Sequence, residues 1–459
     1  MVAREQWAPL ARSLLALLPY HLTPGQEAAV GAIVGDLRGP APMNRLLQGD
    51  VGCGKTVVAL LALLEAVDLG YQAALMAPTE FLACQHFDRF QALLGQMGEA
   101  ERPVLALLTG STKKAKQVRQ SIGSGEVAVV VGTHALISEG TLFQRLGMVV
   151  VDEQHRFGVN QRSRLVEKGL AGEESALPSP HVLAMSATPI PRTLALALYG
   201  DMRITKIVDQ PAGRKPVVTR VMTERREVYE AVRREVAEGG RAFVVFPRVE
   251  ESEEAPHMRA VEEEFARIEG GEEGAEVSVL RGLPCGLVHG RMGTEAKAEA
   301  LRRFKTGETK VLFCTTVIEV GIDIPEATVM VVENAERYGL AALHQLRGRV
   351  GRGPRASQCL LLTASPAGRA KLEILETSQD GFLLAEEDLE RRGAGELLGH
   401  KQSGHLPSFS LVNYQTDGPI LLRARKMAEE VVERYPQLEG LPRVREELSA
   451  RFSNTSHGM

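Results

Sequence analysis

The residues best suited to chemistry form one stretch, Gly49-Asp50-Val51-Gly52-Cys53-Gly54-Lys55-Thr56. It fits the pattern G-x-x-x-x-G-K-[ST] and stands between a short apolar run and an amphipathic stretch over residues 55–69, the context of a strand, a phosphate-binding loop and a helix. Glycines there let backbone N–H groups wrap phosphates at the positive end of the helix. We therefore expect these eight residues to bind ATP, with Lys55 at the β- and γ-phosphates and the Thr56 hydroxyl on Mg²⁺.

A pair of carboxylates, Asp152 and Glu153, directly follows the apolar run of residues 148–151. The carboxyl end of a buried strand is where an open α/β sheet presents its ligand crevice. An acidic pair at such a place more often caps a helix or lies in a solvated turn, but the phosphate loop upstream reverses that preference. Asp152 is the candidate Mg²⁺ ligand, and Glu153 the candidate group that orients and deprotonates the attacking water.

Arginines alternate with glycines later in the chain, in Gln345-Leu346-Arg347-Gly348-Arg349-Val350-Gly351-Arg352. Such arginines can neutralise the charge that grows on a γ-phosphate during transfer. A basic loop that faces solvent or nucleic acid is the other interpretation. Beside a phosphate loop, Arg349 and Arg352 are better explained as catalytic arginine fingers. ATP would then lie between two lobes, and hydrolysis would open and close the cleft.

The elements that must position these residues repeat one rhythm of apolar run, polar turn and amphipathic stretch. We expect strands over residues 45–48, 72–77, 104–108, 127–131, 148–151 and 182–185, and then over residues 217–222, 242–246, 286–289, 311–314, 329–332 and 358–362. Nearly continuous Val, Leu and Ile runs with helices between them favour parallel strands buried on both faces. The expected fold class is α/β, with two open parallel sheets covered by helices on both sides.

The division into domains follows from the same rhythm. A break is expected at the polar, Pro- and Gly-containing residues 209–215, and the strands stop near residue 362. We expect a lead-in helix (1–21), an ATP-binding lobe (22–209), a second lobe (210–365) and a mostly helical C-terminal region (366–459). The irregular residues 250–282 combine an acidic run, an amphipathic helix expected over residues 258–268 and a loop rich in Gly and Glu, and their charge pattern is interpreted as that of a solvated insertion.

The composition excludes several classes of protein. The 459 residues are 44% hydrophobic and 24% charged, an ordinary globular balance. The longest apolar run ends at Glu65, far short of the ~20 residues of a bilayer span, and the N-terminal residues carry no signal-peptide cleavage site. Five scattered cysteines without CxxC spacing predict reduced thiols and no zinc site.

The net charge of −4 means that a nucleic acid would have to be held by a local basic groove and by main-chain donors. A basic cluster formed by Lys113, Lys114, Lys116 and Arg119 is interpreted as a solvated helix face that borders such a path. Aromatic residues make up only 5% of the chain, which disfavours base stacking as the main contact.

Together these motifs resemble the motor of superfamily 2 helicases, and more narrowly the bacterial RecG family of ATP-dependent branched-DNA helicases. The resembling segments include LTPGQ at residues 22–26, APTE at 77–80, TGS at 109–111, GTH at 132–134, DEQHRFG at 152–158, SATPIPRT at 186–193 and TTVIEVGIDIP at 315–325. Glutamine at position 154 and LALALYGDM at residues 194–202 favour RecG. The resemblance implies two tandem RecA-like lobes of the P-loop NTPase type.

The resemblance also implies roles for further residues. Gln26 is expected to read adenine, and Asp323 to lie near the ribose or the arginine fingers. Coupling of hydrolysis to movement is expected from Gln154, His155, Ser186 and Thr188, and from Arg392 and Gln402 in a translocation motif behind the lobes. A helix, Gly-rich loop and helix with no such role is the alternative for that motif.

Contacts with the DNA backbone are expected from Thr79, Gln85, Thr109, Thr133, His134, Thr315 and Thr316. Hydroxyl and main-chain donors of this kind grip phosphates without reading the base sequence. His134 considered alone is more often a structural hydrogen-bonding residue.

RecG proteins carry a large wedge domain ahead of the motor, which splits the arms of a DNA junction. Too few residues precede Gln26 to form such a domain. We therefore expect a motor without its wedge that retains ATP hydrolysis.

The expected activity is that of a Mg²⁺- and ATP-dependent DNA helicase or translocase at replication forks and recombination intermediates, acting by fork reversal and branch migration of Holliday junctions. The expected partners are branched or duplex DNA and single-strand-binding protein. We expect a monomer with no membrane contact, located in the bacterial cytoplasm and associated with the nucleoid. The open alternatives are a coupling-factor-like translocase that acts on RNA polymerase, a non-catalytic nucleotide-gated DNA clamp, and an RNA helicase.

Overall fold

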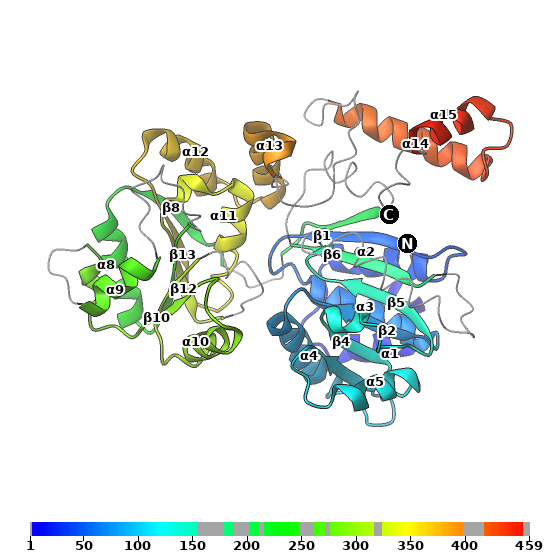
Figure 1. The fold of residues 1–459 in the computed structure, drawn as a ribbon, viewed down its shortest axis with the longest axis horizontal. Helices are drawn as coiled ribbons and strands as arrows, with labels where there is room; N and C mark the ends of the chain where they lie inside the picture. Colours follow the sequence, from blue (N-terminus) through cyan, green and yellow to red (C-terminus); the bar gives the residue numbers. More distant parts are fainter. Residues whose placement is uncertain are drawn as a thin grey trace. The chain divides into compact units, whose positions relative to one another are not determined.

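The computed structural model describes residues 2–154, 179–187, 202–210, 215–247, 261–270, 276–315, 324–397 and 417–452. Both sheets belong to one compact unit, residues 1–189 and 202–388. Figure 1 labels the helices and strands around each sheet. Helices α14 (Gly418–Arg434) and α15 (Pro442–Phe452) belong to a second unit. The site described below lies in the first unit.

The first sheet has seven strands in the order β3-β4-β2-β5-β6-β1-β7, and all its pairings are parallel. The strands are β1 (Asn44–Gly49), β2 (Gln72–Met76), β3 (Leu105–Leu108), β4 (Val129–Gly132), β5 (Leu146–Val151), β6 (His181–Ser186) and β7 (Arg203–Ile207). The first six lie where the apolar runs predict them. The sequence does not predict β7, because this edge strand reads RITKI and has polar residues at three of its five positions.

Helices cover both faces of this sheet. They are α1 (Pro9–Leu17), α2 (Pro24–Leu37), α3 (Lys55–Asp68), α4 (Glu80–Leu94) and α5 (Ala115–Gly123), with the 3-10 turns η1 (Arg4–Gln6) and η2 (His134–Ile137). Side chains alternate along each strand, so Leu75 packs into the core that contains α3, and Met76 into the core on the opposite face. Residues 57–66 of α3 are buried without interruption, which fixes the loop that precedes this helix.

The second sheet has the strand order β10-β11-β9-β12-β13-β8, again parallel. Its strands are β8 (Val218–Met222), β9 (Arg241–Val245), β10 (Cys285–Val288), β11 (Val311–Cys314), β12 (Ala327–Val332) and β13 (Gln358–Leu362). Around it lie α8 (Arg225–Ala237), α9 (Val261–Gly270), η4 (Glu276–Leu280), α10 (Thr294–Thr306), η6 (Ala335–Arg337), α11 (Leu340–Arg347), α12 (Pro366–Thr377) and the start of α13 (Gly381–Leu397). The expected α/β class with two RecA-like parallel sheets is confirmed.

The helix expected over residues 258–268 is present as α9, but the interpretation of this region as a solvated insertion is wrong for that helix. Val261 and Ile268 pack into the core of the second sheet, and Glu264 is fully buried. Arg225 at the start of α8 donates to Glu264 at 3.1 Å and to Glu333, directly after β12, at 2.9 Å. A count of charges cannot reveal that one acidic residue of the helix faces a buried arginine.

Within the described residues, no helix is both long enough and apolar enough to cross a bilayer. The five cysteines are free thiols. Burial raises the pKa of Cys359 to about 12, so this thiol is unreactive at neutral pH.

Candidate active site

The loop between β1 and α3 has the geometry that its glycines predict. Gly52 and Gly54 adopt φ angles of 83° and 87°, in the left-handed region that favours glycine. A Cβ atom at Gly49 would lie 2.5 Å from Cys53 Sγ, so the loop also folds closely over the end of β1. It leads into α3 with Lys55 as the first helical residue and Thr56 as the second, at the helix end that attracts anions.

Gln26 fastens this loop to the preceding helix. Its Nε2 donates to the Cys53 carbonyl at 2.8 Å, and its Oε1 accepts from the Thr23 N–H at 2.9 Å. Thr23 and Gln26 together form a capping box at the start of α2. Gln26 is 3% exposed, and both ends of its amide are bound within the protein. Its predicted contact with adenine stays a prediction.

The Lys55 side chain lies across the loop. Its Nζ donates to the carbonyl oxygens of Gly49 at 2.6 Å and Asp50 at 2.9 Å. An ammonium on a flexible stem can exchange such carbonyls for phosphate oxygens. The place of Lys55 thus suits a phosphate ligand.

The carboxylate pair follows β5, at the same edge of the sheet as the phosphate loop. Asp152 accepts from His86 Nε2 through Oδ2 at 2.7 Å, and from the Glu153 N–H through Oδ1 at 3.0 Å. Burial alone would raise the pKa of Asp152, but the bond and charge of His86, with the charge of Lys55, hold it below its ordinary value. Burial and the neighbouring Asp152 charge raise the pKa of Glu153. Two carboxyl pKa values pushed apart in this way are typical of a metal ligand beside a general base.

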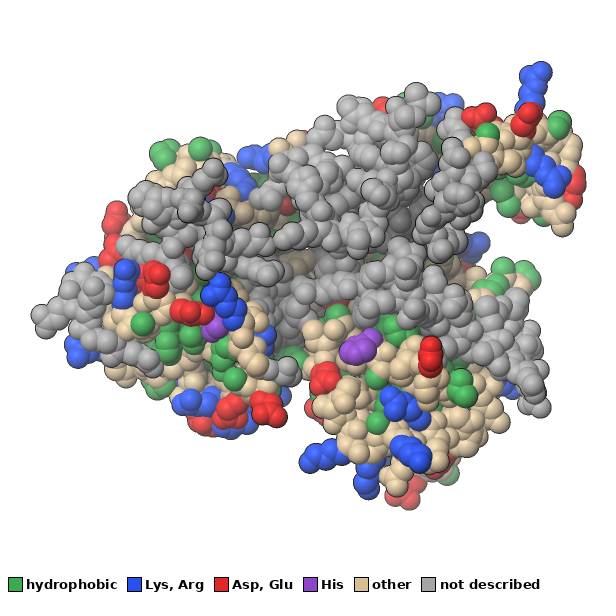
Figure 2. Space-filling view, viewed as in Figure 1, with side chains coloured by type: hydrophobic (Ala, Val, Ile, Leu, Met, Phe, Trp, Pro, Cys, Tyr) green, Lys and Arg blue, Asp and Glu red, His purple; other side chains and the backbone are tan. Residues whose placement is uncertain are grey.

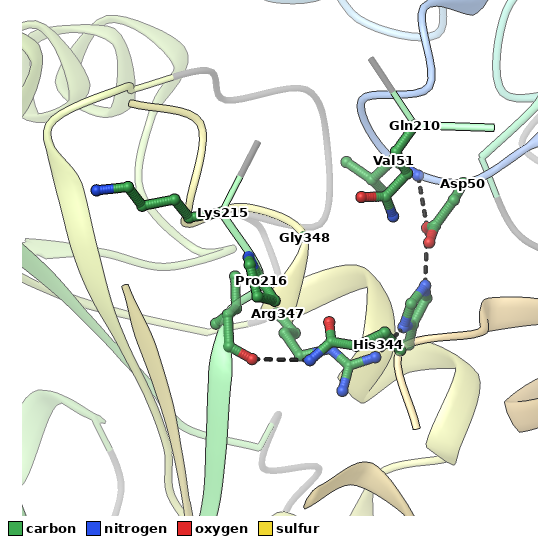
Figure 3. A pocket seen from close by; sticks show the side chains of 10 residues that line it. Asp50, Val51, Gln210, Lys215, Pro216, His344, Arg347 and Gly348 are labelled. Carbon is green, nitrogen blue, oxygen red and sulfur yellow. Dashed lines mark hydrogen bonds and ion pairs between the residues drawn. The ribbon is translucent and has the colours of Figure 1, made fainter. Parts of the chain in front are cut away.

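The second lobe reaches the phosphate loop directly, as Figure 3 shows. His344 in α11 lies with Nε2 2.7 Å from Asp50 Oδ1 and with Nδ1 2.6 Å from Arg347 Nη2. Because a guanidinium only donates, Nδ1 accepts and Nε2 carries the proton that it donates to Asp50. A Cβ atom at Gly348 would lie 2.8 Å from Val51 Cβ, so the end of α11 packs against the loop. A polar cavity of about 30 Å³ lies here, lined also by Gln210, Lys215, Pro216, Val217 and Gln379.

The arginine segment continues from this contact. Arg349 is 5% exposed, and its charge partly offsets the rise in the pKa of Glu153 that burial and Asp152 cause. Arg352 donates from Nε to the Gly348 carbonyl at 3.1 Å. Arg347 donates from Nη1 to main-chain carbonyls at the end of α12 and just after it, each at 2.9 Å. Arginine fingers at Arg349 and Arg352 stay a prediction.

Two oxygen donors fit a magnesium ion. Asp152 is ionised at neutral pH because its pKa is lowered, and Thr56 offers a hydroxyl at the start of α3. The described residues contain no group of three or more His, Cys, Asp or Glu side chains arranged for a metal. Magnesium bound through substrate phosphates needs only one or two protein oxygens, so the pair is compatible with it.

The predicted DNA contacts lie in loops at the ends of strands. Thr79 accepts from the Leu82 N–H at 3.3 Å and so caps α4, and Thr109 forms a cluster of hydroxyls with its neighbours after β3. His134 is exposed, and Thr133 is 2% exposed. Further members of the set are Gln85, half-buried on α4, Thr315, directly after β11, and Thr316, outside the described residues. Their contact with DNA stays a prediction.

Basic side chains gather on the surface over α4 and α5 in Figure 2. Lys113, Lys114 and Lys116 are exposed. Because α5 begins at Ala115, the interpretation as a helix face is wrong for Lys113 and Lys114, which precede the helix. Arg119 instead donates to Thr141 Oγ1 at 3.3 Å.

Among the predicted coupling residues, Gln154 donates from Nε2 to Met202 Sδ at 3.5 Å, and Ser186 is buried at the end of β6. The following lie outside the described residues: His155, Thr188, Asp323, Gln402 and the side chain of Arg392, whose backbone is in α13. All these roles stay predictions.

Sequence reasoning missed His86 and His344, and it did not predict that Arg347 of the arginine segment donates to His344 and to main-chain carbonyls. A single histidine or arginine carries no signal of the carboxylate or carbonyl that it meets across the fold. Helical spacing could have indicated one of them, because His86 follows Thr79 by about two turns and therefore lies on the same side of α4.

Comparison with known proteins identifies helicases as similar proteins. Family profiles described as "DEAD/DEAH box helicase", "Helicase conserved C-terminal domain" and "ATP-dependent DNA helicase RecG, domain 3, C-terminal" match residues 23–197, 225–354 and 378–444. The chain is 50% identical to the ATP-dependent DNA helicase RecG of Synechocystis sp. over 96% of this chain and 51% of that protein. It is 46% identical to RecG of Streptococcus pneumoniae over 90% of this chain and 59% of that protein. The solved structure of RecG bound to a three-way DNA junction matches with a TM-score of 0.70 and 40% identity, over 90% of this chain and 52% of that one.

Two RecA-like lobes, a phosphate loop, a carboxylate pair after β5 and an arginine segment define a superfamily 2 helicase motor. The chain belongs to the RecG family of these helicases. It spans about half the length of the curated relatives that it matches.

Proposed function

We propose that the chain is an ATP-driven motor that moves along duplex DNA. The observation that carries the proposal is the meeting of both lobes at the phosphate loop, where His344 contacts Asp50 and Arg349 lies near Glu153. A nucleotide held at that loop would touch groups from both lobes. Its hydrolysis would then change how the lobes contact each other, which is how closure of a cleft is coupled to chemistry.

In this proposal each described residue has one task. Backbone N–H groups of residues 50–56 and the Lys55 ammonium bind the phosphates. Glu153, whose pKa is raised, orients the attacking water and takes its proton. Arg349 and Arg352 stabilise the charge that develops on the transferred phosphoryl group. Gln26 contacts the adenine. Asp323, which is outside the described residues, is proposed to lie near the ribose or the arginine fingers.

Thr56 and Asp152 would hold the magnesium ion. When bound, the ion neutralises charge on the β- and γ-phosphates. Asp152 is prepared for this task by His86, which occupies one carboxylate oxygen and keeps the group ionised.

The proposed track is the DNA backbone, contacted by the strand-end loops that contain Thr79, Thr109 and Thr133. Support comes from the relatives, which are named ATP-dependent DNA helicases, and from the matched RecG structure bound to a three-way DNA junction. We therefore propose forks and recombination intermediates as substrates. The proposal also includes a division into four parts after residues 21, 209 and 365. We further propose that the protein is a monomer in the bacterial cytoplasm, associated with the nucleoid, and that it contacts single-strand-binding protein.

DNA-stimulated release of phosphate from ATP tests this function. We expect wild-type turnover to rise with duplex or branched DNA, Lys55→Ala to lose nucleotide binding, and Glu153→Gln to bind nucleotide but lose turnover by about 10²–10⁴-fold. The exposed Glu99→Gln is the matched carboxylate-to-amide control. Wild-type turnover in both site variants would overturn the proposal. Comparison of single-stranded, duplex, forked and four-way DNA with duplex RNA identifies the track.

A further inference from the structure

One helix, α4, carries a predicted DNA contact at its start and touches the carboxylate pair further along. Thr79 is its N-cap, and His86 lies about two turns later, roughly 10 Å along the axis. Both residues lie in the first compact unit.

The outer end of α4 is fastened to the loop after β3. Glu80 Oε1 accepts from the Ser111 N–H at 3.1 Å, and a Cβ atom at Gly110 would lie 2.9 Å from the same oxygen. Thr79 and the loop of residues 109–111 are both predicted to contact a DNA strand. A strand bound there would therefore press on the first turn of α4 and on the loop at once.

The inner contact of α4 is made by His86, which is 8% exposed. Its Nε2 lies 2.7 Å from Asp152 Oδ2. Because an ionised carboxylate only accepts, His86 Nε2 is the donor. The other oxygen, Asp152 Oδ1, accepts from the Glu153 N–H, so His86 fixes the rotation of the same carboxyl group that is oriented toward the candidate general base.

The helix between these contacts is well suited to transmit a displacement. Leu82, Phe90 and Leu94 on its inward side are buried in the core of the first sheet, and the ring of His86 lies 6.1 Å from that of Phe90. A continuous hydrogen-bonded helix moves as one piece over this length, whereas packed cores resist gradual deformation. A shift of the first turn therefore moves His86 relative to Asp152.

We propose that α4 transmits the binding of a DNA strand at Thr79 and residues 109–111 to Asp152, with His86 as the positioning residue at the inner contact. The inference rests on the proposed function, because it concerns how DNA stimulates hydrolysis at that ATP site. His86 touches neither DNA nor nucleotide in this scheme. It sets the orientation of a carboxylate that would hold Mg²⁺.

The test compares His86→Leu, which removes the donor, with His86→Gln, which can place an amide N–H near the position of Nε2. The exposed Asp88→Asn on the same helix is the control. Three quantities are measured for each variant: duplex-DNA affinity by fluorescence anisotropy, the ratio of DNA-stimulated to basal ATP turnover, and the affinity for a fluorescent ADP analogue against Mg²⁺ concentration, with and without duplex DNA.

We expect His86→Leu to bind duplex DNA like the wild type, to lose about tenfold or more of its DNA stimulation, and to bind Mg²⁺–nucleotide with the same affinity whether or not DNA is present. His86→Gln should restore most of the DNA stimulation of turnover and most of the effect of DNA on Mg²⁺–nucleotide affinity. Asp88→Asn should change neither quantity. If His86 had only a structural role, its replacement would instead weaken DNA affinity, DNA stimulation and nucleotide affinity together, or would change none of them. Full stimulation in His86→Leu, or a failure of His86→Gln to restore it, overturns the inference.

A second variant keeps the test decisive if His86→Leu does not fold. Glu80→Ala cuts the bond to Ser111 at the outer end, and we expect it to lower DNA stimulation several-fold with little change in DNA affinity. Unchanged stimulation in Glu80→Ala contradicts the link. A wild-type chain that shows no DNA stimulation refutes the proposed function instead, so the two failures are distinguishable.

Discussion

Replacement of Gly54 by alanine has a consequence that can be worked out from the contacts around it. Gly54 has a φ of 87°, and a Cβ atom there would lie 2.2 Å from Gln26 Nε2. That Nε2 donates to the Cys53 carbonyl at 2.8 Å. Alanine therefore imposes two separate costs, a left-handed backbone at position 54 and the displacement of the Gln26 amide from the loop.

The free-energy cost of Gly54→Ala should differ between the wild type and a chain that already carries Gln26→Ala. A left-handed residue with a Cβ atom costs roughly 1–2 kcal/mol. Loss of the amide leaves the Cys53 carbonyl without its donor, at a cost of roughly 1–3 kcal/mol. Gly54→Ala should thus lower the unfolding free energy by roughly 2–5 kcal/mol in the wild type, but by only about 1–2 kcal/mol when Gln26→Ala has already removed the amide.

Differential scanning calorimetry of the four chains measures this difference. At about 2.1 cal/mol/K per residue, a change of 1 kcal/mol moves the transition of a 459-residue chain by about 1 °C. Gly54→Ala should therefore shift the midpoint by about 1–3 °C more in the wild type than in Gln26→Ala. Gly98→Ala, where a Cβ atom meets nothing within 4 Å, is the control. Equal shifts in both backgrounds would refute the role of Gln26 as the tie of the phosphate loop.

Three more predictions concern single contacts. His344→Ala removes the 2.7 Å bond to Asp50, a loss of about 1.5–3 kcal/mol, so hydrogen exchange of the loop amides should quicken about tenfold or more; unchanged exchange contradicts this. Burial raises the pKa of Glu65 above its ordinary value of 4.5. The neutral Glu65 carboxyl therefore adds to the free energy of unfolding below pH 4.5. This contribution, on the order of 1 kcal/mol, is lost as the pH rises through the raised pKa. Glu65→Gln keeps an acceptor for the backbone N–H bound there, and its thermal midpoint should lack that decline; parallel pH profiles would refute it. Arg225→Ala leaves two buried carboxylates without their cation and should cost about 3–5 kcal/mol in denaturant titrations; a cost below about 1 kcal/mol would mean that the buried pairs contribute little.

Local features of this protein could be predicted from its sequence, because short-range chemistry determines them. The turn of the phosphate loop requires glycine at positions with positive φ, and Gly52 and Gly54 supply it. Buried parallel strands appear as apolar runs, so β11 and β13 have the predicted bounds without change. Local motifs such as this loop also allowed the helicase family to be predicted from the sequence.

Contacts between distant side chains could not be predicted. The bonds from His86 to Asp152 and from His344 to Asp50 join residues that only the fold brings together, and no periodicity encodes them. The buried pairing of Glu264 was hidden for the same reason, since an acidic residue has the same type whether it faces water or Arg225.

The most direct test of the central idea, that the second lobe completes the ATP site of the first, is to measure nucleotide affinity and DNA-stimulated turnover of Arg349→Ala side by side. The half-buried Arg355→Ala, whose partners lie on α8 and just after it, is the matched control. We predict that Arg349→Ala binds nucleotide nearly as well as the wild type but loses about 10³-fold or more of its turnover. Turnover equal to that of the wild type would contradict an ATP site shared between the two lobes.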